Sequence, residues 1–167
     1  MIKLRFSRDY GVLPALIRTA TWFHFDHVEL LLPYEGLLGS SPQGGVAIRP
    51  LDWKVSIDFE YASVACDDIT TGRVLQKLRS QIGKPYDYSA LLHLPFGQRD
   101  WRDKNQWTCS ELIAWSFEES RRPILNAQLS NRLAPRDIYL SPHVMPEREF
   151  PPTLTAGELI RKHKLGG

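Results

Sequence analysis

The chain has 167 residues, of which 43% are hydrophobic and 24% are charged, with 21 Lys and Arg against 19 Asp and Glu. This length fits a single domain, residues 1–167, with a hydrophobic core of its own. The formal net charge is only +2 and the basic residues are scattered along the chain, which excludes the strongly basic surface typical of nucleic-acid binding.

No apolar run reaches the length of a membrane-spanning helix, since Leu30-Leu31-Leu32 is followed at once by Pro33. The first residues, MIKLRFSRDYG, lack the apolar segment of a signal peptide. We therefore expect a cytoplasmic protein without an integral membrane segment. Cys66 and Cys109 are expected to be reduced thiols in that compartment. The oligomeric state is left open.

The N-terminal part of the chain predicts strands and one helix. Residues 2–6 are typical of a short strand, and a helix is expected through residues 13–17. His27–Leu32 is a compact apolar run of strand length. Residues 36–45 are rich in turn-forming types and lead to a further strand at Gly45–Arg49.

The clearest strand signal covers residues 53–61, where apolar and polar side chains alternate. A period of two indicates one buried face and one wet face. The apolar residues that this pattern places on the buried face are Trp53, Val55, Ile57, Phe59 and Tyr61.

The later part of the chain predicts helices. One begins near Thr70 and ends before Gly83 and Pro85, with an apolar face formed by Val74, Leu75, Leu78 and Ile82. A polar and aromatic loop over residues 86–106 precedes a second helix, and a short third helix is expected near residues 155–163. Strands first and helices later predict an α+β fold with a mostly antiparallel sheet.

One cysteine, Cys109, stands where an apolar helix is expected to begin. Thr108 is the candidate N-cap, and the face that follows it contains Leu112, Ile113, Trp115 and Phe117. A cysteine in the first turn of a helix experiences the positive end of the helix dipole, which favours the nucleophilic thiolate. The position is therefore typical of a cysteine hydrolase, although a cysteine that only packs in the core is the alternative.

A catalytic cysteine needs a base, and His27 is the best-placed histidine. At the start of a strand, its ring can project from the sheet edge toward the N-terminus of a helix packed alongside. A purely structural histidine is the alternative. His24 would face the other side of the same strand, and the sequence has no Cys-x-x-Cys or His-Glu-x-x-His spacing. We therefore expect neither a metal ion nor another cofactor.

Three short motifs resemble a known family when they are taken together. They are His27-Val28-Glu29, Gly83-Lys84-Pro85-Tyr86-Asp87 and Cys109-Ser110-Glu111-Leu112. They resemble the circularly permuted relatives of NlpC-type papain-like cysteine peptidases, in which the histidine strand precedes the cysteine helix. The order is also similar to that in the lecithin-retinol-acyltransferase-like branch. The resemblance implies a permuted papain-like fold, with a small, mostly antiparallel sheet packed against the cysteine-bearing helix.

The resemblance also implies roles for individual residues. Cys109 would attack a carbonyl carbon as a thiolate, with His27 as base and later as acid, and the Cys109 N–H would help to bind the oxyanion. Tyr86 would donate a hydrogen bond beside the nucleophile, with ordinary packing as the alternative. Glu111 replaces the glycine of NlpC-type enzymes, so it narrows the site, selects cationic substrates or supplies favourable first-turn charge.

The residue that orients the histidine is where the sequence departs from the family. Related permuted proteins often carry a Glu on the strand after the histidine, near Gly39, but no carboxylate stands there. Ser40 or Ser41 would be a weak replacement. Glu29 lies two residues after His27 and hence on the same strand face, so it is the preferred candidate. A solvated strand carboxylate is the alternative for Glu29.

These features favour a thiol hydrolase, of the amidase or peptidase kind, that cleaves an amide bond in a peptidoglycan-type or other small peptide. Two other interpretations stay open. One is an ester or thioester hydrolase or acyltransferase acting on lipid acyl groups. The other is a non-catalytic binding or phage-associated module that retained the fold. A chain without a leader does not fit a standard secreted wall enzyme, whereas phage delivery, lysis or an intracellular substrate would each explain it.

Overall fold

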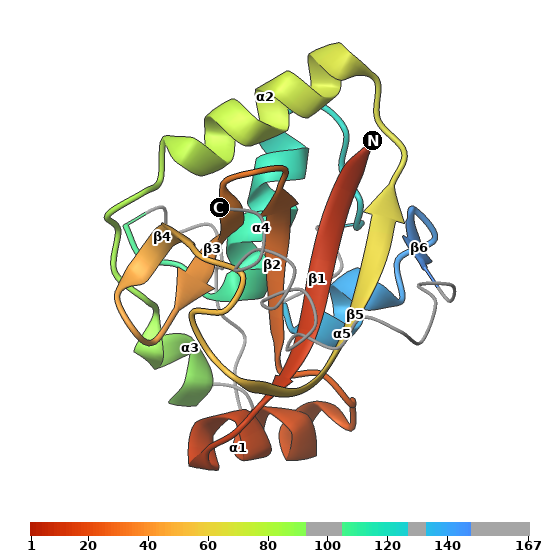
Figure 1. The fold of residues 1–167 in the computed structure, drawn as a ribbon. Helices are drawn as coiled ribbons and strands as arrows, with labels where there is room; N and C mark the ends of the chain where they lie inside the picture. The colour runs from red at the N-terminus through yellow and green to blue at the C-terminus, as the bar shows by residue number, and fades with distance from the viewer. Residues whose placement is uncertain (93–104, 127–132, 148–167) are drawn as a thin grey trace, which may run out of the picture.

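A six-stranded antiparallel sheet forms the centre of the molecule (Figure 1). The computed structural model describes residues 1–92, 105–126 and 133–147. The strands lie in the order β4-β3-β2-β1-β5-β6, and each neighbouring pair is antiparallel. Their bounds are β1 (Ile2–Asp9), β2 (His27–Leu32), β3 (Gly36–Ser41), β4 (Gly45–Arg49), β5 (Ser56–Val64) and β6 (Val144–Pro146). The predicted α+β class with an antiparallel sheet is therefore confirmed.

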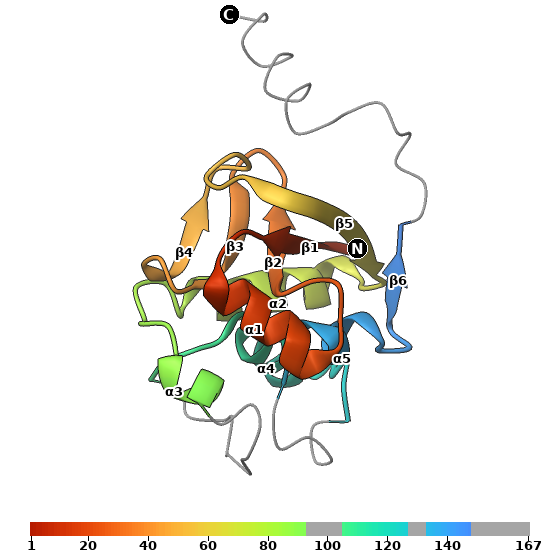
Figure 2. The same ribbon diagram turned by 90° about the horizontal axis from the view of Figure 1, so that it is seen from below.

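The helices lie against one face of the sheet and across one end of it. Their bounds are α1 (Val12–Thr21), α2 (Asp68–Arg79), α3 (Tyr88–Leu92), α4 (Cys109–Glu119) and α5 (Pro135–Tyr139). α4 packs on β2 and β3, and α2 packs on α4. α1 crosses the end of the molecule at which β2 begins (Figures 1 and 2). Within the described ranges, none of these helices has the length and apolar character needed to span a membrane.

The face of the sheet that meets α2 and α4 is apolar. Alternate residues of β1, β2 and β5 point to this side, where their side chains are removed from water together with the inner face of α4. Core residues with no exposed surface are Leu4, Phe6, Val28, Leu38, Ala62, Val64, Leu112, Ile113 and Phe117. The burial of this apolar surface fixes α4, and with it Cys109, against the histidine strand.

The opposite face of the sheet is polar and is also buried. The register of β1 with β2 sets Ser7 opposite His27 and Arg5 opposite Glu29. The connection from β4 to β5 runs across this face (Figure 1), and the Arg5 guanidinium donates a hydrogen bond to the Leu51 carbonyl at 3.1 Å. Charged side chains are therefore held inside the protein, on the side away from the apolar core.

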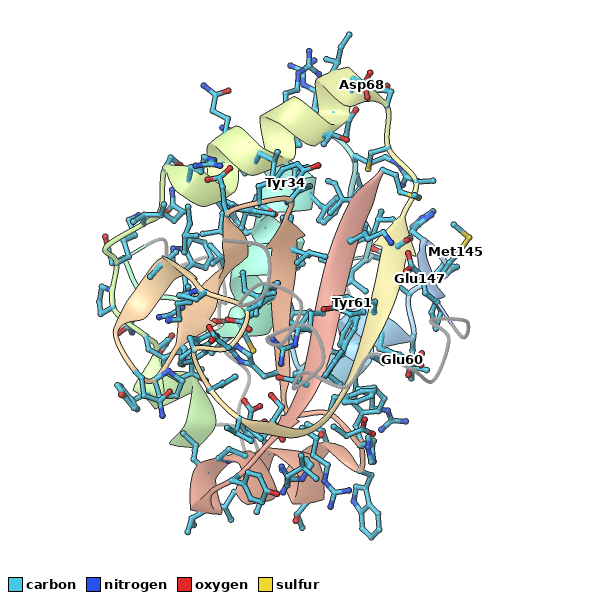
Figure 3. All side chains as sticks on the ribbon, viewed as in Figure 1. Tyr34, Glu60, Tyr61, Asp68, Met145 and Glu147 are labelled. Atoms are coloured by element: carbon cyan, nitrogen blue, oxygen red, sulfur yellow. The ribbon has the colours of Figure 1, made fainter. Side chains whose placement is uncertain are left out.

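The outer edge of the polar face is closed by β6. The Glu147 carboxylate, just after β6, accepts hydrogen bonds from Lys3 at 3.0 Å and from the Ser63 hydroxyl. The Glu147 N–H donates to the Tyr61 carbonyl at 2.9 Å. Figure 3 shows Tyr61 and Glu147 on this side of the sheet. These contacts fasten a short edge strand to β5.

The strand predicted at residues 53–61 begins later and buries the opposite face. It is observed as β5, Ser56–Val64, and two residues of the predicted apolar face are exposed, Val55 just before β5 by 80% and Ile57 by 41%. Ala62 and Val64 are buried instead, because the β1–β5 register places them on the core face. The predicted buried face was wrong, since the alternation alone does not tell which side the helices cover.

The segment predicted to be turn-rich, residues 36–45, contains the strand β3. Leu37 and Leu38 are fully buried, and β3 pairs with both β2 and β4. Gly36 has a φ of +117°, and a Cβ there would lie 2.1 Å from the Arg49 carbonyl oxygen. Pairing on both sides thus overrides the turn preference of glycine and serine.

The strands predicted at residues 27–32 and 45–49 match β2 and β4. β1 extends three residues beyond the predicted end of the first strand, and α1 contains residues 13–17.

α2 begins two residues earlier than predicted, because the side chain of Asp67 caps it. α2 also ends before Ile82, which is 46% exposed. The expected loop over residues 86–106 contains the short helix α3. The helix expected near residues 155–163 lies outside the described residues.

Candidate active site

α4 begins at Cys109 because the residues around it form a capping box. The Thr108 hydroxyl accepts a hydrogen bond from the Glu111 N–H at 3.3 Å, and the Glu111 carboxylate accepts one from the Thr108 N–H at 3.1 Å. The predicted N-cap is therefore confirmed, and Glu111 acts as the first-turn partner of the cap. The first N–H groups of a helix lack intrahelical acceptors, so Cys109 lies where an anion is stabilised.

Cys109 lies at the point where the ladder between β2 and β3 ends. β1 pairs with β2 as far as His27, whereas β3 pairs with β2 only over Leu30–Leu32. The backbone N–H of Val28 thereby contributes to lowering the pKa of the Cys109 thiol. Cys109 is thus placed beside a strand as well as on its own helix.

His27 and Glu29 complete a row of three interacting side chains. The charges of His27 and Cys109 act on each other's pKa, and Nε2 of His27 lies 3.3 Å from Oε1 of Glu29. Cys109 is 4% exposed, His27 5% and Glu29 0%. The structure therefore brings together the three residues that the sequence singled out as nucleophile, base and preferred orienting group.

The three groups change each other's ionisation. Burial and Lys54 lower the pKa of His27, but the Glu29 and Cys109 charges outweigh them and raise it to about 9. Burial raises the pKa of Glu29, and the His27 cation lowers it to about 2. Burial also raises the pKa of the Cys109 thiol, but His27 and the Val28 N–H lower it below its ordinary value. Between about pH 2 and pH 9 the His27 imidazolium therefore lies between the Glu29 carboxylate and a thiol whose pKa is lowered.

Cationic side chains from other elements face Glu29. Arg5 lies opposite it on β1, and Lys54, in the connection before β5, is held by an ion pair with Asp9. Both cations lower the pKa of Glu29. The Arg49 guanidinium on β4 also interacts with the Glu29 charge. Together these charges keep Glu29 ionised although the protein buries it completely.

Ser40 and Tyr86 lie beside Trp107, in the segment that leads to Cys109. The Ser40 hydroxyl donates to the Trp107 carbonyl at 2.6 Å, two residues before Cys109. The backbone of Tyr86 pairs with that of Trp107 in an isolated parallel β-bridge, and Tyr86 is 5% exposed. Burial and the charges of Cys109 and Glu111 raise the pKa of Tyr86, so its phenol stays protonated. The observed hydrogen bond of Ser40 goes to the cysteine segment, while Glu29 is the residue beside His27.

Several residues that shape the site were not singled out from the sequence. Arg5 occupies an alternate position of a predicted strand, and that alternation is the signal that could have placed it beside Glu29. Lys54 belongs to the connection before β5, whose path across the sheet no local pattern predicts. Ser41, the second serine candidate, donates to the Gln43 side chain at 2.8 Å within the β3–β4 turn.

Comparison with solved structures shows the fold. The chain is similar to the crystal structure of metalloprotein yiiX from Escherichia coli O157:H7, DUF1105, with a TM-score of 0.67. The match covers 87% of this chain and 94% of that chain at 14% sequence identity. At this identity the likeness shows a shared fold and nothing about chemistry. No family model matches the sequence, and no curated protein matches it.

Proposed function

We propose that this protein is a thiol hydrolase that cleaves an amide bond, in a peptidoglycan-type or other small peptide, by a Cys–His mechanism. The observation that carries the proposal is the buried pair of Cys109 and His27, whose charges act on each other, with Glu29 3.3 Å from the imidazole. The resemblance of the three motifs to permuted papain-like peptidases supports the fold type and supplies the substrate class. The lowered pKa of the Cys109 thiol supports nucleophilic catalysis by cysteine as the type of reaction.

The reaction has two acyl-transfer steps. The Cys109 thiolate attacks the carbonyl carbon, and the negative charge on the oxygen is stabilised by N–H groups at the start of α4. The His27 imidazolium then gives its proton to the leaving amine, and a thioester with Cys109 remains. His27, now neutral, takes a proton from water, which attacks the thioester and releases the acid. Glu29 keeps the imidazole oriented and stabilises its cationic form in both steps.

The steps above use only side chains and backbone N–H groups of this chain, together with water. The structural neighbour is described as a metalloprotein, which raises the question of a metal here. In residues 1–92, 105–126 and 133–147, no three His, Cys, Asp or Glu side chains are grouped so that they could hold a metal ion. The donors in these ranges do not fit a metal centre, and we derive no step through one.

Alkylation by iodoacetamide tests the proposal with a control inside the same chain. We expect Cys109, whose pKa is lowered, to react at a lower pH than Cys66, whose pKa is raised by burial. Mass spectrometry of the two peptides follows both thiols in one sample. If Cys109 stays unreactive until the pH at which Cys66 reacts, the thiol is not activated and the hydrolase proposal fails.

The bond type is tested with small substrates. Short peptidoglycan-type peptides, activated acyl esters and acyl thioesters are incubated with the wild type and with Cys109→Ala. We expect peptide cleavage that depends on Cys109. Turnover of the esters or thioesters alone would contradict the amide specificity and favour the acyl-lipid interpretation.

A further inference from the structure

Gly39 on β3 leaves open the space that the Glu29 side chain fills. The β2–β3 register pairs Leu30 with Leu38, so Gly39 comes next to Glu29. A Cβ at Gly39 would lie 2.8 Å from Cγ of Glu29 and 3.3 Å from its Cβ. These atoms belong to the inner part of a fully buried side chain, which cannot swing into solvent. A side chain at position 39 and the present Glu29 therefore exclude each other.

The backbone itself does not require glycine at position 39. Gly39 pairs with Ala47 in the regular β3–β4 ladder, and it lacks the positive φ found at Gly36 and Gly45. A glycine inside a strand weakens the strand, and it often marks a close approach of another group. The close group here is the Glu29 side chain.

We propose that Gly39 is a positioning residue of the active site, because its missing side chain lets Glu29 reach His27 from their common strand. The catalytic meaning of this inference rests on the proposed function. β3 cannot easily move aside for a larger residue, since the Arg49 guanidinium donates to the carbonyl of Gly39 at 3.1 Å and of Gly45 at 2.6 Å. A Cβ at position 39 therefore displaces Glu29.

The consequence of this displacement follows from the other charges around the imidazole. The charged groups that face His27 and Glu29 are Asp9 and Arg5 on β1, Arg49 on β4, Lys54 in the connection before β5, and Cys109 on α4. Once Glu29 moves away, Lys54 remains as a nearby cation and burial still opposes protonation. The imidazole must then lose its proton at lower pH.

The glycine-to-alanine variant Gly39→Ala tests the proposal, with Gly72→Ala as the matched control. In the wild type His27 is expected to titrate near pH 9, measured by the NMR signals of its imidazole ring. Gly39→Ala should lower this pKa by about one unit or more, a tenfold change in the protonation equilibrium. Gly72→Ala should leave it unchanged, because no atom lies within 4 Å of a Cβ at Gly72. An unchanged titration in Gly39→Ala overturns the positioning role.

A second pair of variants removes the clash and separates positioning from general destabilisation. In the Glu29→Ala background, Gly39→Ala has no carboxylate to displace, so it should cause no further shift of the His27 pKa. The exchanged variant Glu29→Gly/Gly39→Glu places a carboxylate in the same space from β3, and we expect His27 to titrate at higher pH in it than in Glu29→Gly. If His27 has the same pKa in Glu29→Gly/Gly39→Glu as in Glu29→Gly, the proposal is also overturned, even if Gly39→Ala does not fold.

The same samples keep the two proposals apart. If Cys109 in the wild type is alkylated at no lower pH than Cys66 while Gly39→Ala still shifts the His27 titration, the hydrolase proposal fails and the positioning role stands. If Cys109 is reactive and Gly39→Ala behaves like Gly72→Ala, the positioning role fails and the hydrolase proposal stands.

Discussion

The two cysteines of this chain both lie next to the N-cap of a helix, but only Cys109 has a pKa below its ordinary value. Cys66 immediately precedes Asp67, the N-cap of α2, and Cys109 immediately follows Thr108, the N-cap of α4. Burial raises the pKa of both thiols. The nearby Asp67 carboxylate raises that of Cys66 further, whereas the charge of His27 reverses the effect at Cys109.

The comparison shows that a helix N-terminus is a weak determinant of thiol reactivity in this protein. A helix dipole contributes a few tenths to about 1 kcal/mol at its end and falls off within the first turn. The His27 imidazolium is a full charge acting on the Cys109 thiol, and it lies buried with its Nε2 3.3 Å from Glu29. The reactive region is therefore defined by the strand β2 as much as by the helix α4.

The largest expected effect is the loss of hydrolytic activity when Cys109, but not Cys66, is replaced. We expect Cys109→Ala to abolish hydrolysis of any responsive substrate, because it removes the atom that forms the acyl intermediate. Cys66→Ala should retain most of the activity, since Cys66 precedes the N-cap of a different helix, α2. Steady-state rates of the two purified variants check this expectation, and equal activity of Cys109→Ala and wild type would end the hydrolase proposal.

The next largest effect is expected from His27→Gln, which should raise the pKa of Cys109 toward that of Cys66. In His27→Gln the thiol loses its cationic neighbour while its burial remains, so the pKa of Cys109 rises. The rate of alkylation by iodoacetamide near neutral pH should fall by about tenfold or more, which corresponds to one pKa unit. Cys66 in the same sample should react at its wild-type rate. A Cys109 rate that is unchanged would show that His27 does not activate it.

His27→Gln should also remove a pH dependence of stability. The pKa of His27 is raised to about 9 in the folded protein, above its ordinary value of 6.5. The contribution of protonated His27 to the free energy of unfolding is thus fully present below about pH 6.5, and it is lost as the pH rises toward 9. Denaturant unfolding of the wild type should show this decline between pH 6.5 and 9, and His27→Gln should show a smaller one.

The parts of this site that could be predicted from the sequence are those with local signals. Thr108 before an apolar helix is an N-cap pattern, and β2 is a compact apolar run, so both elements were found where they occur. Glu29 followed from the period of two along the same strand. Each of these inferences needs only residues that are close in sequence.

The rest depends on register between strands, which no local pattern fixes. The segment containing Gly39 was predicted to be turn-rich from its residue types. It is a strand because β2 and β4 pair with it on both sides, and those partners are distant from local sequence signals. Arg5 comes opposite Glu29 only through the β1–β2 register. The buried face of β5 was wrong for the same reason, since its alternation is compatible with either side of the sheet.

A smaller effect tests which residue orients the imidazole. Glu29→Gln keeps the shape of the side chain and removes its charge, so the pKa of His27 falls from about 9 and the alkaline limb of activity moves to lower pH. Ser40→Ala removes a hydrogen bond to the Trp107 carbonyl and should leave this limb in place. The pH dependence of the hydrolysis rate distinguishes the two variants. If Ser40→Ala shifts the limb and Glu29→Gln does not, the orienting role belongs to Ser40.

The smallest expected effects concern the two N-caps beside the two cysteines. Thr108→Ala removes the hydroxyl that accepts from the Glu111 N–H, and it should lower the free energy of unfolding by about 1 kcal/mol. Asp67→Ala removes the corresponding acceptor of the Thr70 N–H on α2 and should also lower stability. Thermal unfolding followed by circular dichroism measures both.

The two cap variants should differ in what they do to the thiols. Thr108→Ala loosens the turn that carries Cys109 and should slow its alkylation slightly, because His27 still supplies the main charge. Asp67→Ala removes the carboxylate that raises the pKa of Cys66, so Cys66 should react somewhat faster. A large loss of Cys109 reactivity in Thr108→Ala, at constant His27 titration, would contradict the view that the imidazolium outweighs the helix end.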